Sequence, residues 1–246
     1  EASFDQRRTG GGLRLGYPLS EKWRQTLRYR YERNDIRNVD NNASLFILEQ
    51  EGVRNTSAVS QRIAYDSRDS RLFPTEGLNA WLDTELTGLG VDVQHVSGRF
   101  GASWYYPVLD RVVFNLLGET GAIQGWGDED VKINERFFLG GTTLRGFETA
   151  GVGPRDILTD DALGGNYFYR GTAELSFPVG LPEELGVKGH SFTDFGTLWD
   201  VDGTSGTNLV DGSARRASAG LGISWRSPLG PVRVDYAIPY ADEEFD

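Results

Sequence analysis

The chain has 246 residues, two histidines, no cysteine and no methionine, and a formal net charge of −11. The absence of cysteine excludes disulfides and thiolate metal sites, and the acidic balance argues against a nucleic-acid partner, which requires a basic face. No run approaches the roughly 18–20 apolar residues of a membrane helix, whereas a membrane β-barrel needs only about 9–11 alternating residues per strand.

Alternating apolar and polar side chains are the main pattern along the chain. In LNAWLDTEL, Leu78, Ala80 and Leu82 share one face. The polar Asn79 and Asp83 lie on the other. A period of two indicates strands, and no convincing amphipathic helix is found. Ten strands are predicted, at 11–17, 22–34, 57–67, 76–87, 92–106, 111–123, 167–177, 188–199, 215–226 and 232–239.

The predicted connections are of two kinds that alternate along the chain. Five are short and hold seven of the nine prolines: PLSEK, RLFPTEG, PVLD, FPVGLPEELG and SPLGP. The others are polar, rich in Gly, Asn and Asp, and mostly longer: 35–56, 124–166, 200–214 and a short TGLG at 87–90. One rim of the sheet is therefore expected to carry tight turns and the other long loops, which is the layout of an outer-membrane barrel.

A soluble β-sandwich or a lipocalin-like barrel would alternate as well. Two features favour the membrane barrel instead. Charges occur on the polar face of nearly every strand, as a wet lumen allows: Arg28, Arg30, Asp83, Glu85, Arg99, Glu119, Arg170, Glu174 and Asp194. Aromatic residues gather near strand ends, as in interfacial girdles: Trp23, Trp104, Tyr105, Tyr106, Tyr167, Tyr169, Trp199 and Trp225.

Candidate enzymatic and metal-binding motifs are weak. DVDGTSGTN (200–208) has its glycine at the wrong position for a calcium loop and lacks the closing glutamate. No nucleophile elbow or dinucleotide fingerprint is found, so no catalytic residue, cofactor or metal is predicted. His190 is expected near a strand end, and the pair Arg215 and Arg216 at a strand start.

The loop at 124–166 contains RFFLGGTTLRGFETAGVGPRD, in which five large apolar side chains surround one arginine, Arg145: Phe137, Phe138, Leu139, Leu144 and Phe147. An arginine partly withdrawn from water requires carboxylate partners. Gly140, Gly141 and Gly146 would permit a tight backbone path. From these residues alone, an inward-folded loop and a solvated outer loop are both open.

FFLGGTTLRGFE, AELSF, FTDFGTLWD and SWRSPLGPVRVDYAIP, in this order, resemble the C-terminal barrel of the BamA family of outer-membrane protein assembly factors. The resemblance covers essentially the whole chain. It implies that 1–246 is part of a sixteen-stranded transmembrane β-barrel in the bacterial outer membrane. The first strands, the last strand and the periplasmic transport-associated domains would lie outside it, so that the chain is a piece of a longer polypeptide.

The resemblance also implies the positions of functional residues. The loop 124–166 would be extracellular and would fold back into the lumen, with its tip packed against the inner wall. The tip would consist of Leu144, Arg145, Gly146 and Phe147, turning on Gly140 and Gly141. Its acidic partners would be Glu174 and Asp194, and Phe192 and Gly196 would complete the partner-strand motif.

The function implied is the folding and insertion of other outer-membrane barrels without covalent chemistry. The implied partners are unfolded β-barrel substrates, the lipoprotein subunits of the assembly machinery, and outer-membrane lipid with lipopolysaccharide. The seam between first and last strands, where substrates would pair, lies outside the chain. Alternatives are a two-partner secretion transporter or a translocation-assembly relative of the same superfamily, which shares the RGF loop, and a plain porin or soluble β-protein, which would lack it.

Overall fold

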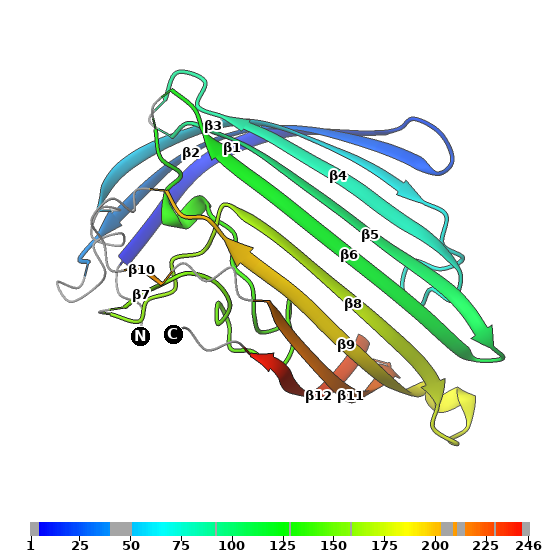
Figure 1. Ribbon diagram of the computed structural model, residues 1–246. Helices are drawn as coiled ribbons and strands as arrows, with labels where there is room; N and C mark the ends of the chain where they lie inside the picture. The colour runs from blue at the N-terminus through cyan, green and yellow to red at the C-terminus, as the bar shows by residue number, and fades with distance from the viewer. Residues whose placement is uncertain are drawn as a thin grey trace.

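The computed structural model describes residues 5–39, 51–91, 93–127, 129–157, 159–202, 209–210, 215–228 and 230–242. These residues form a ten-stranded antiparallel sheet in the order β1-β2-β3-β4-β5-β6-β8-β9-β11-β12. Its strands are β1 (Asp5–Pro18), β2 (Trp23–Arg37), β3 (Gly52–Asp66), β4 (Gly77–Thr87), β5 (His95–Leu109), β6 (Val112–Gly125), β8 (Tyr167–Pro178), β9 (Val187–Trp199), β11 (Arg216–Ser227) and β12 (Gly230–Asp242). Figure 1 shows the sheet curving into an open trough, with β1 and β12 as its edges. The prediction of an all-β antiparallel barrel sheet is confirmed.

Each predicted strand corresponds to one strand of this sheet, but two begin well before the predicted starts at 11 and 57. β1 begins at Asp5 and β3 at Gly52. The sequence Gln6-Arg7-Arg8 is polar on both faces, so alternation does not reveal this end of β1. Pairing with β2 keeps both segments extended, from Asp5 opposite Arg37 and from Gly52 opposite Ile36.

The structure adds short elements that alternation does not predict. β7 (Arg155–Asp156) pairs with β10 (Leu209–Val210), and the 3-10 turns are η1 (Ile133–Glu135) and η2 (Glu183–Leu185). None of the helical elements among the described residues is long and apolar enough to cross a membrane. Residues 40–50, 203–208 and 211–214 of the predicted loops lie outside the described part of the chain, and so does most of the stretch DVDGTSGTN.

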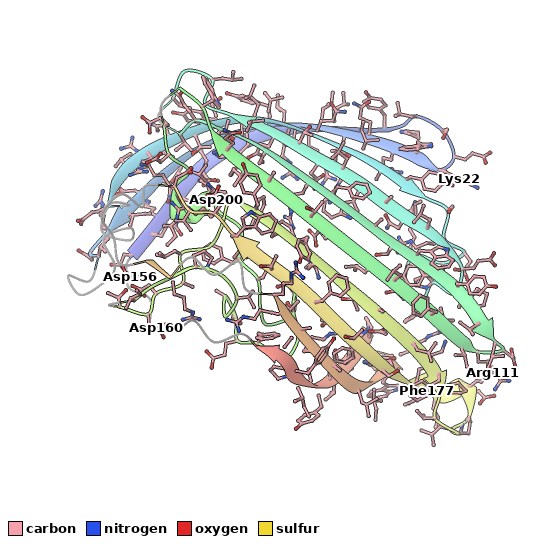
Figure 2. All side chains as sticks on the ribbon, viewed as in Figure 1. Lys22, Arg111, Asp156, Asp160, Phe177 and Asp200 are labelled. Atoms are coloured by element: carbon pink, nitrogen blue, oxygen red, sulfur yellow. The ribbon has the colours of Figure 1, made fainter. Side chains whose placement is uncertain are left out.

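The two kinds of connection lie at opposite rims of the sheet. Figure 2 labels Lys22, Arg111 and Phe177 at the rim of the short turns, and Asp156 and Asp200 at the rim of the long loops. Antiparallel neighbours joined in sequence must alternate between rims, so the alternating loop lengths observed in the sequence sort onto two sides of the molecule.

The convex face of the sheet is apolar and exposed. On β12, Val234 is 69% exposed and Tyr236 71%, and on β11 Leu221 and Ile223 are also exposed. The intervening residues of these strands, such as Asp235, face the concave side. A soluble protein would not present such a band to water, whereas the hydrocarbon of a membrane solvates it.

The core lies on the concave side, which we call the lumen, where the loop between β6 and β8 packs against the wall (Figure 1). The loop contributes Leu139, Leu144 and Val152 to one buried cluster, and the wall contributes Phe168 from β8 and Leu198 from β9. Phe137 and Phe147 of the loop pack against this cluster. Four of the five apolar side chains expected around Arg145 thus pack in or against this cluster, whereas Phe138 is 39% exposed.

Candidate functional site: the lumen loop and its carboxylates

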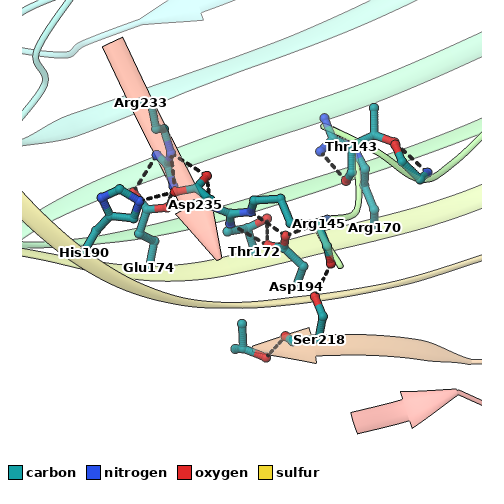
Figure 3. Close-up of polar contacts among 12 residues, drawn as sticks. Thr143, Arg145, Arg170, Thr172, Glu174, His190, Asp194, Ser218, Arg233 and Asp235 are labelled. Atoms are coloured by element: carbon teal, nitrogen blue, oxygen red, sulfur yellow. Dashed lines mark hydrogen bonds and ion pairs between the residues drawn. The ribbon is translucent and has the colours of Figure 1, made fainter. Parts of the chain in front are cut away.

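Arg145 lies at the tip of the loop and contacts three carboxylates on three strands (Figure 3). Its Nε and Nη2 donate to Asp194 Oδ2 and Oδ1 of β9, both at 2.7 Å, and its backbone N–H donates to Oδ2 at 3.2 Å. Its Nη1 donates to Glu174 Oε2 of β8 at 3.3 Å and to Asp235 Oδ2 of β12 at 3.2 Å. The paired bonds to Asp194 use the planar fork of the guanidinium, which gives geometric specificity as well as strength.

The ion pair between Arg145 and Asp194 is largely withdrawn from water. The Arg145 side chain is 16% exposed and that of Asp194 3%. Burial opposes the charged guanidinium, but the hydrogen bonds and charge of Asp194, with Asp235 and Glu174, outweigh burial and raise the pKa of Arg145. The arginine is therefore held as a cation in a place that excludes most solvent.

The ring of Phe192 lies against one face of the Arg145 guanidinium. Phe192 lies two residues before Asp194 on β9, so both side chains face the lumen. The Arg145 guanidinium carbon lies 3.3 Å from the centroid of the Phe192 ring, which is a cation–π contact. Phe192 is itself buried. The ring replaces water on one face of the guanidinium while the carboxylates occupy its edge.

The other tip residues fit the wall closely. Leu144 is fully buried, and Gly196 lies beneath it: a Cβ at Gly196 would come within 3.2 Å of Leu144 Cδ1. Gly146 lies against β11 and β12, where a Cβ would meet Ser218 Cβ at 3.1 Å. Ser218 Oγ donates to the Arg145 carbonyl. Small residues on both surfaces thus allow the loop backbone to approach the sheet.

The loop reaches this position by a tight backbone path. Gly140 has φ of +127°, and a Cβ there would lie 2.0 Å from the Glu148 carbonyl oxygen. Gly141 has φ of +58°, and its N–H donates to the carbonyl of Phe147 at 2.9 Å. The residues on either side of the tip are therefore bound to each other, so the tip is presented as a closed turn.

A second arginine, which lies on the wall, binds the loop backbone. Arg170 of β8 donates from Nη1 to the Thr143 carbonyl at 3.1 Å and from Nε to Glu119 Oε2 at 2.7 Å. Arg99 of β5 donates to the other oxygen of Glu119 at 2.6 Å. Glu119 thus joins β5, β6 and β8 beside the tip.

The structure brings together the sequence-predicted residues Arg145, Glu174, Asp194, Phe192 and Gly196. Phe147 packs at the edge of the buried cluster, and Gly140 and Gly141 lie in the turn behind the tip. No group of three or more His, Cys, Asp or Glu side chains among the described residues is arranged to hold a metal ion.

Several members of the site are absent from the sequence prediction. Asp235 and Arg233 of β12 join the charge network, and Thr172 Oγ1 donates to Asp194 Oδ1 at 2.8 Å. Alternation in VRVDYAI puts Arg233 and Asp235 on the polar face of their strand, and this pattern is the signal from which they could have been predicted. His190, expected near a strand end, is buried in β9, and its Nε2 is hydrogen bonded to Asp235.

Arg216 is the first residue of β11, at the predicted strand start, and it is buried.

A cavity of about 650 Å³ adjoins the site in the lumen. Arg145, Glu174 and Asp194 line it from the loop and the wall, and Phe73 lines it from the turn between β3 and β4. The site therefore faces a cavity in the lumen that both charged and apolar side chains line.

Comparison with known proteins identifies the fold family. A model of the Omp85 superfamily domain matches residues 1–246. The outer membrane protein assembly factor BamA of Neorickettsia risticii is 37% identical over 229 residues, covering 93% of this chain and 31% of that protein. The human sorting and assembly machinery component 50 homolog is 27% identical over 208 residues, covering 80% of this chain and 44% of that protein.

A crystal structure of BamA from Haemophilus ducreyi lacking POTRA domains 1–3 has the same fold, with a TM-score of 0.86 at 24% identity. The match covers 98% of this chain and 52% of that one. The chain thus spans less than half the length of the two relatives named above. It belongs to the Omp85 superfamily, and its sheet is part of a β-barrel of the outer membrane.

Proposed function

We propose that the full-length protein is an outer-membrane assembly factor that folds and inserts other β-barrel proteins. It acts without covalent chemistry, and the chain is the part of its barrel that holds the lumen loop. The observation that carries this proposal is the buried arginine of the loop tip, bound at once by carboxylates of β8, β9 and β12. A plain porin or a soluble β-protein would lack this loop, whereas transporters of the same superfamily share it and are distinguished by the experiment below.

Relatives that cover most of this chain support the proposal. Both the BamA of Neorickettsia risticii and the human relative carry names that describe assembly. In physical terms, such a protein offers an unpaired strand edge to an incoming strand, and main-chain hydrogen bonds drive the pairing. The barrel must then be stable enough to hold its shape while its seam opens.

In this account the tip residues have a structural and regulatory role. Arg145 with Glu174 and Asp194 holds the loop, Leu144 and Phe147 anchor it, and Gly146 and Gly196 permit the close approach. The loop braces the wall from the inside, so that loosening at the seam does not spread into β6, β8 and β9. The partners are unfolded outer-membrane barrels, lipoprotein subunits of the assembly machinery, and outer-membrane lipid with lipopolysaccharide.

The test is depletion of the full-length protein in its source cell, followed by quantification of the outer-membrane proteome. A general assembly factor predicts a broad loss of unrelated barrels and their accumulation in the periplasm. A two-partner secretion transporter or a translocation-assembly relative predicts the loss of one or a few dedicated clients while other barrels persist. That second result would overturn the proposal.

A further inference from the structure

Strand β12 makes side-chain contacts that reach across the neighbouring strands β11 and β9. Arg233 Nη2 of β12 donates to Glu174 Oε2 of β8 at 2.6 Å, and its Nη1 donates to Oε1 at 3.2 Å. The strands β9 and β11 lie between β8 and β12. Three strand spacings amount to about 14 Å in a flat sheet.

Side chains in a sheet project away from its plane, so an arginine and a glutamate three strands apart in a flat sheet would not meet. They meet here because the sheet curls strongly between β8 and β12, as Figure 1 shows. The two bidentate-like bonds between Arg233 and Glu174 therefore exist only while this curl is present. The whole free energy of these two bonds therefore favours the curled form of the sheet over a flat one.

A second contact crosses β11 in the same region. His190 of β9, Gly222 of β11 and Asp235 of β12 are in register. Gly222 has no side chain, and a Cβ there would lie 2.2 Å from Asp235 Oδ1 and 2.3 Å from His190 Nε2. The glycine leaves the space in which the imidazole and the carboxylate bond to each other over the intervening strand.

The carboxylates are shared with the loop tip. Glu174 and Asp235 each accept bonds from Arg145 and from Arg233, and Asp235 binds Arg233 Nε at 2.8 Å. Two arginines face three carboxylates, Glu174, Asp194 and Asp235. Removing Arg145 would leave one cation among three carboxylates, whose mutual repulsion would push β12 away from β8.

We propose that Arg233, Asp235 and His190 form a clamp that sets the curl of the sheet from β8 to β12 and couples it to the docked loop tip. Undocking of Arg145 weakens the clamp, and release of β12 weakens the hold on Arg145, because such coupling is reciprocal. The inference adds a regulation to the proposed lumen-loop site, and it rests on that proposal: the inclination of β12 relative to β8 reports whether the loop is docked.

The test measures the curl directly in the full-length protein. Leu175 of β8 and Tyr236 of β12 lie on one line across the sheet, through Ser191 and Leu221. This chain has no native cysteine. With any cysteine elsewhere in the full-length protein replaced by serine, spin labels at Leu175→Cys and Tyr236→Cys report one distance by pulsed electron paramagnetic resonance. Because both labels lie on the convex face, flattening of the sheet brings them closer together.

Arg233→Ala and Asp235→Ala are expected to shorten and broaden the distance between the labels, and Arg145→Ala to shift it in the same direction. Arg62→Ala is the matched control, because Arg62 forms a lumen ion pair with Asp83 between the adjacent strands β3 and β4. Its label distance should not change. The distance is measured only in protein whose barrel stays folded in detergent without heating, so that unfolded variants do not contribute.

An unchanged distance in folded Arg233→Ala and Asp235→Ala would overturn the clamp, and so would a shift in Arg145→Ala alone, which would assign the curl to the loop by itself. An equal shift in Arg62→Ala would show a general loosening and would also overturn it. The measurement uses no substrate. The two proposals can therefore be judged separately. The distance measurement can overturn the clamp while the depletion experiment supports an assembly factor, and it can support the clamp while depletion indicates a dedicated transporter.

Discussion

The two halves of the lumen wall use the same chemical groups in different ways. On β1–β5 the ion pairs remain partly exposed: Arg62 and Asp83 of the neighbouring strands β3 and β4 are 2.7 Å apart, with side chains 49% and 34% exposed. On β6–β12 the loop covers the centre of the charge network: Arg145 bonds to three strands, and its side chain and that of Asp194 are only 16% and 3% exposed. An exposed pair contributes about 0–1 kcal/mol, whereas breaking a buried pair costs roughly 3–5 kcal/mol.

The difference follows from the loop and not from the strands. Both halves carry charged side chains on their lumen face, because the lumen of the barrel is wet. Where Leu144 and Phe147 cover the wall, water is excluded, and the charged side chains there pair with one another. Electrostatics thus becomes strong where the hydrophobic contacts of the loop have lowered the local dielectric. Three variants probe this comparison, and a fourth probes a turn outside the two halves.

Reversal of charge at Arg145 should have the largest effect. Arg145→Glu places a fourth carboxylate among Glu174, Asp194 and Asp235, so we expect the loop to undock and the folded barrel to lose at least roughly 3–5 kcal/mol. Two measurements check this. The first asks whether the barrel stays folded in detergent without heating, and the second whether the variant complements a strain depleted of the wild-type protein. Arg62→Glu in the wet half should retain both. Equal damage from the two reversals would remove the distinction between the halves.

Truncation of the apolar anchor should come next. Leu144→Ala leaves a cavity among Val152, Phe168 and Leu198, with an expected loss of about 2–5 kcal/mol in the free energy of unfolding. Denaturant titration of the full-length protein measures this loss. The exposed Leu13→Ala on the convex face of β1 is the matched control and should change the free energy little. If the two truncations were equivalent, the loop would not be packed against the wall.

A methyl group at the turn behind the tip should have a smaller effect. Gly140→Ala forces an L side chain into positive φ and against the Glu148 carbonyl, with an expected cost of about 1–3 kcal/mol. Gly118→Ala on β6 meets nothing within 4 Å and serves as the control. Thermal unfolding of the two variants compares them. A neutral Gly140→Ala would mean that the loop does not need this backbone path.

The smallest expected effect lies outside both halves, in the turn between β3 and β4. Hydrogen bonds from Thr75 Oγ1, from the Thr75 N–H and from the Glu76 N–H lower the pKa of Asp69 from 3.8 to about 2. Because the folded pKa is the lower one, the stabilisation is complete above pH 3.8 and is lost as pH falls toward 2. Asp69→Asn should therefore reduce stability slightly at pH 7 and narrow its difference from the wild type near pH 2. A constant difference across that range would contradict this assignment.

Much of the fold could be predicted from the sequence because it depends on local alternation. The period of two in segments such as LNAWLDTEL gives the strands, and proline in the short turns separates the two rims. The ends of β1 and β3 could not be predicted, since Asp5–Gly10 and 52–56 carry no alternation and are held extended by pairing with β2. The short β7 and β10 depend on contact between distant loops.

The site residues also divide into those that can be predicted from the sequence and those that cannot. The motifs around Arg145, Glu174 and Asp194 can be recognised in the sequence through their resemblance to a family. Arg233 and His190 could not be assigned, because their roles depend on the curl of the sheet. Sequence spacing places Arg233 and Glu174 on separate strands, and only the three-dimensional path brings their charges together.

The central claim is that Arg145 and Asp194 form one buried unit that holds the loop to the wall. A double-mutant cycle on the full-length protein, with Arg145→Ala, Asp194→Ala and the double variant, tests it most directly through the free energy of unfolding. We expect the loss in the double variant to be smaller than the sum of the two single losses, by a coupling energy of about 1–3 kcal/mol. Strictly additive losses would show that the two residues act independently and would contradict the account.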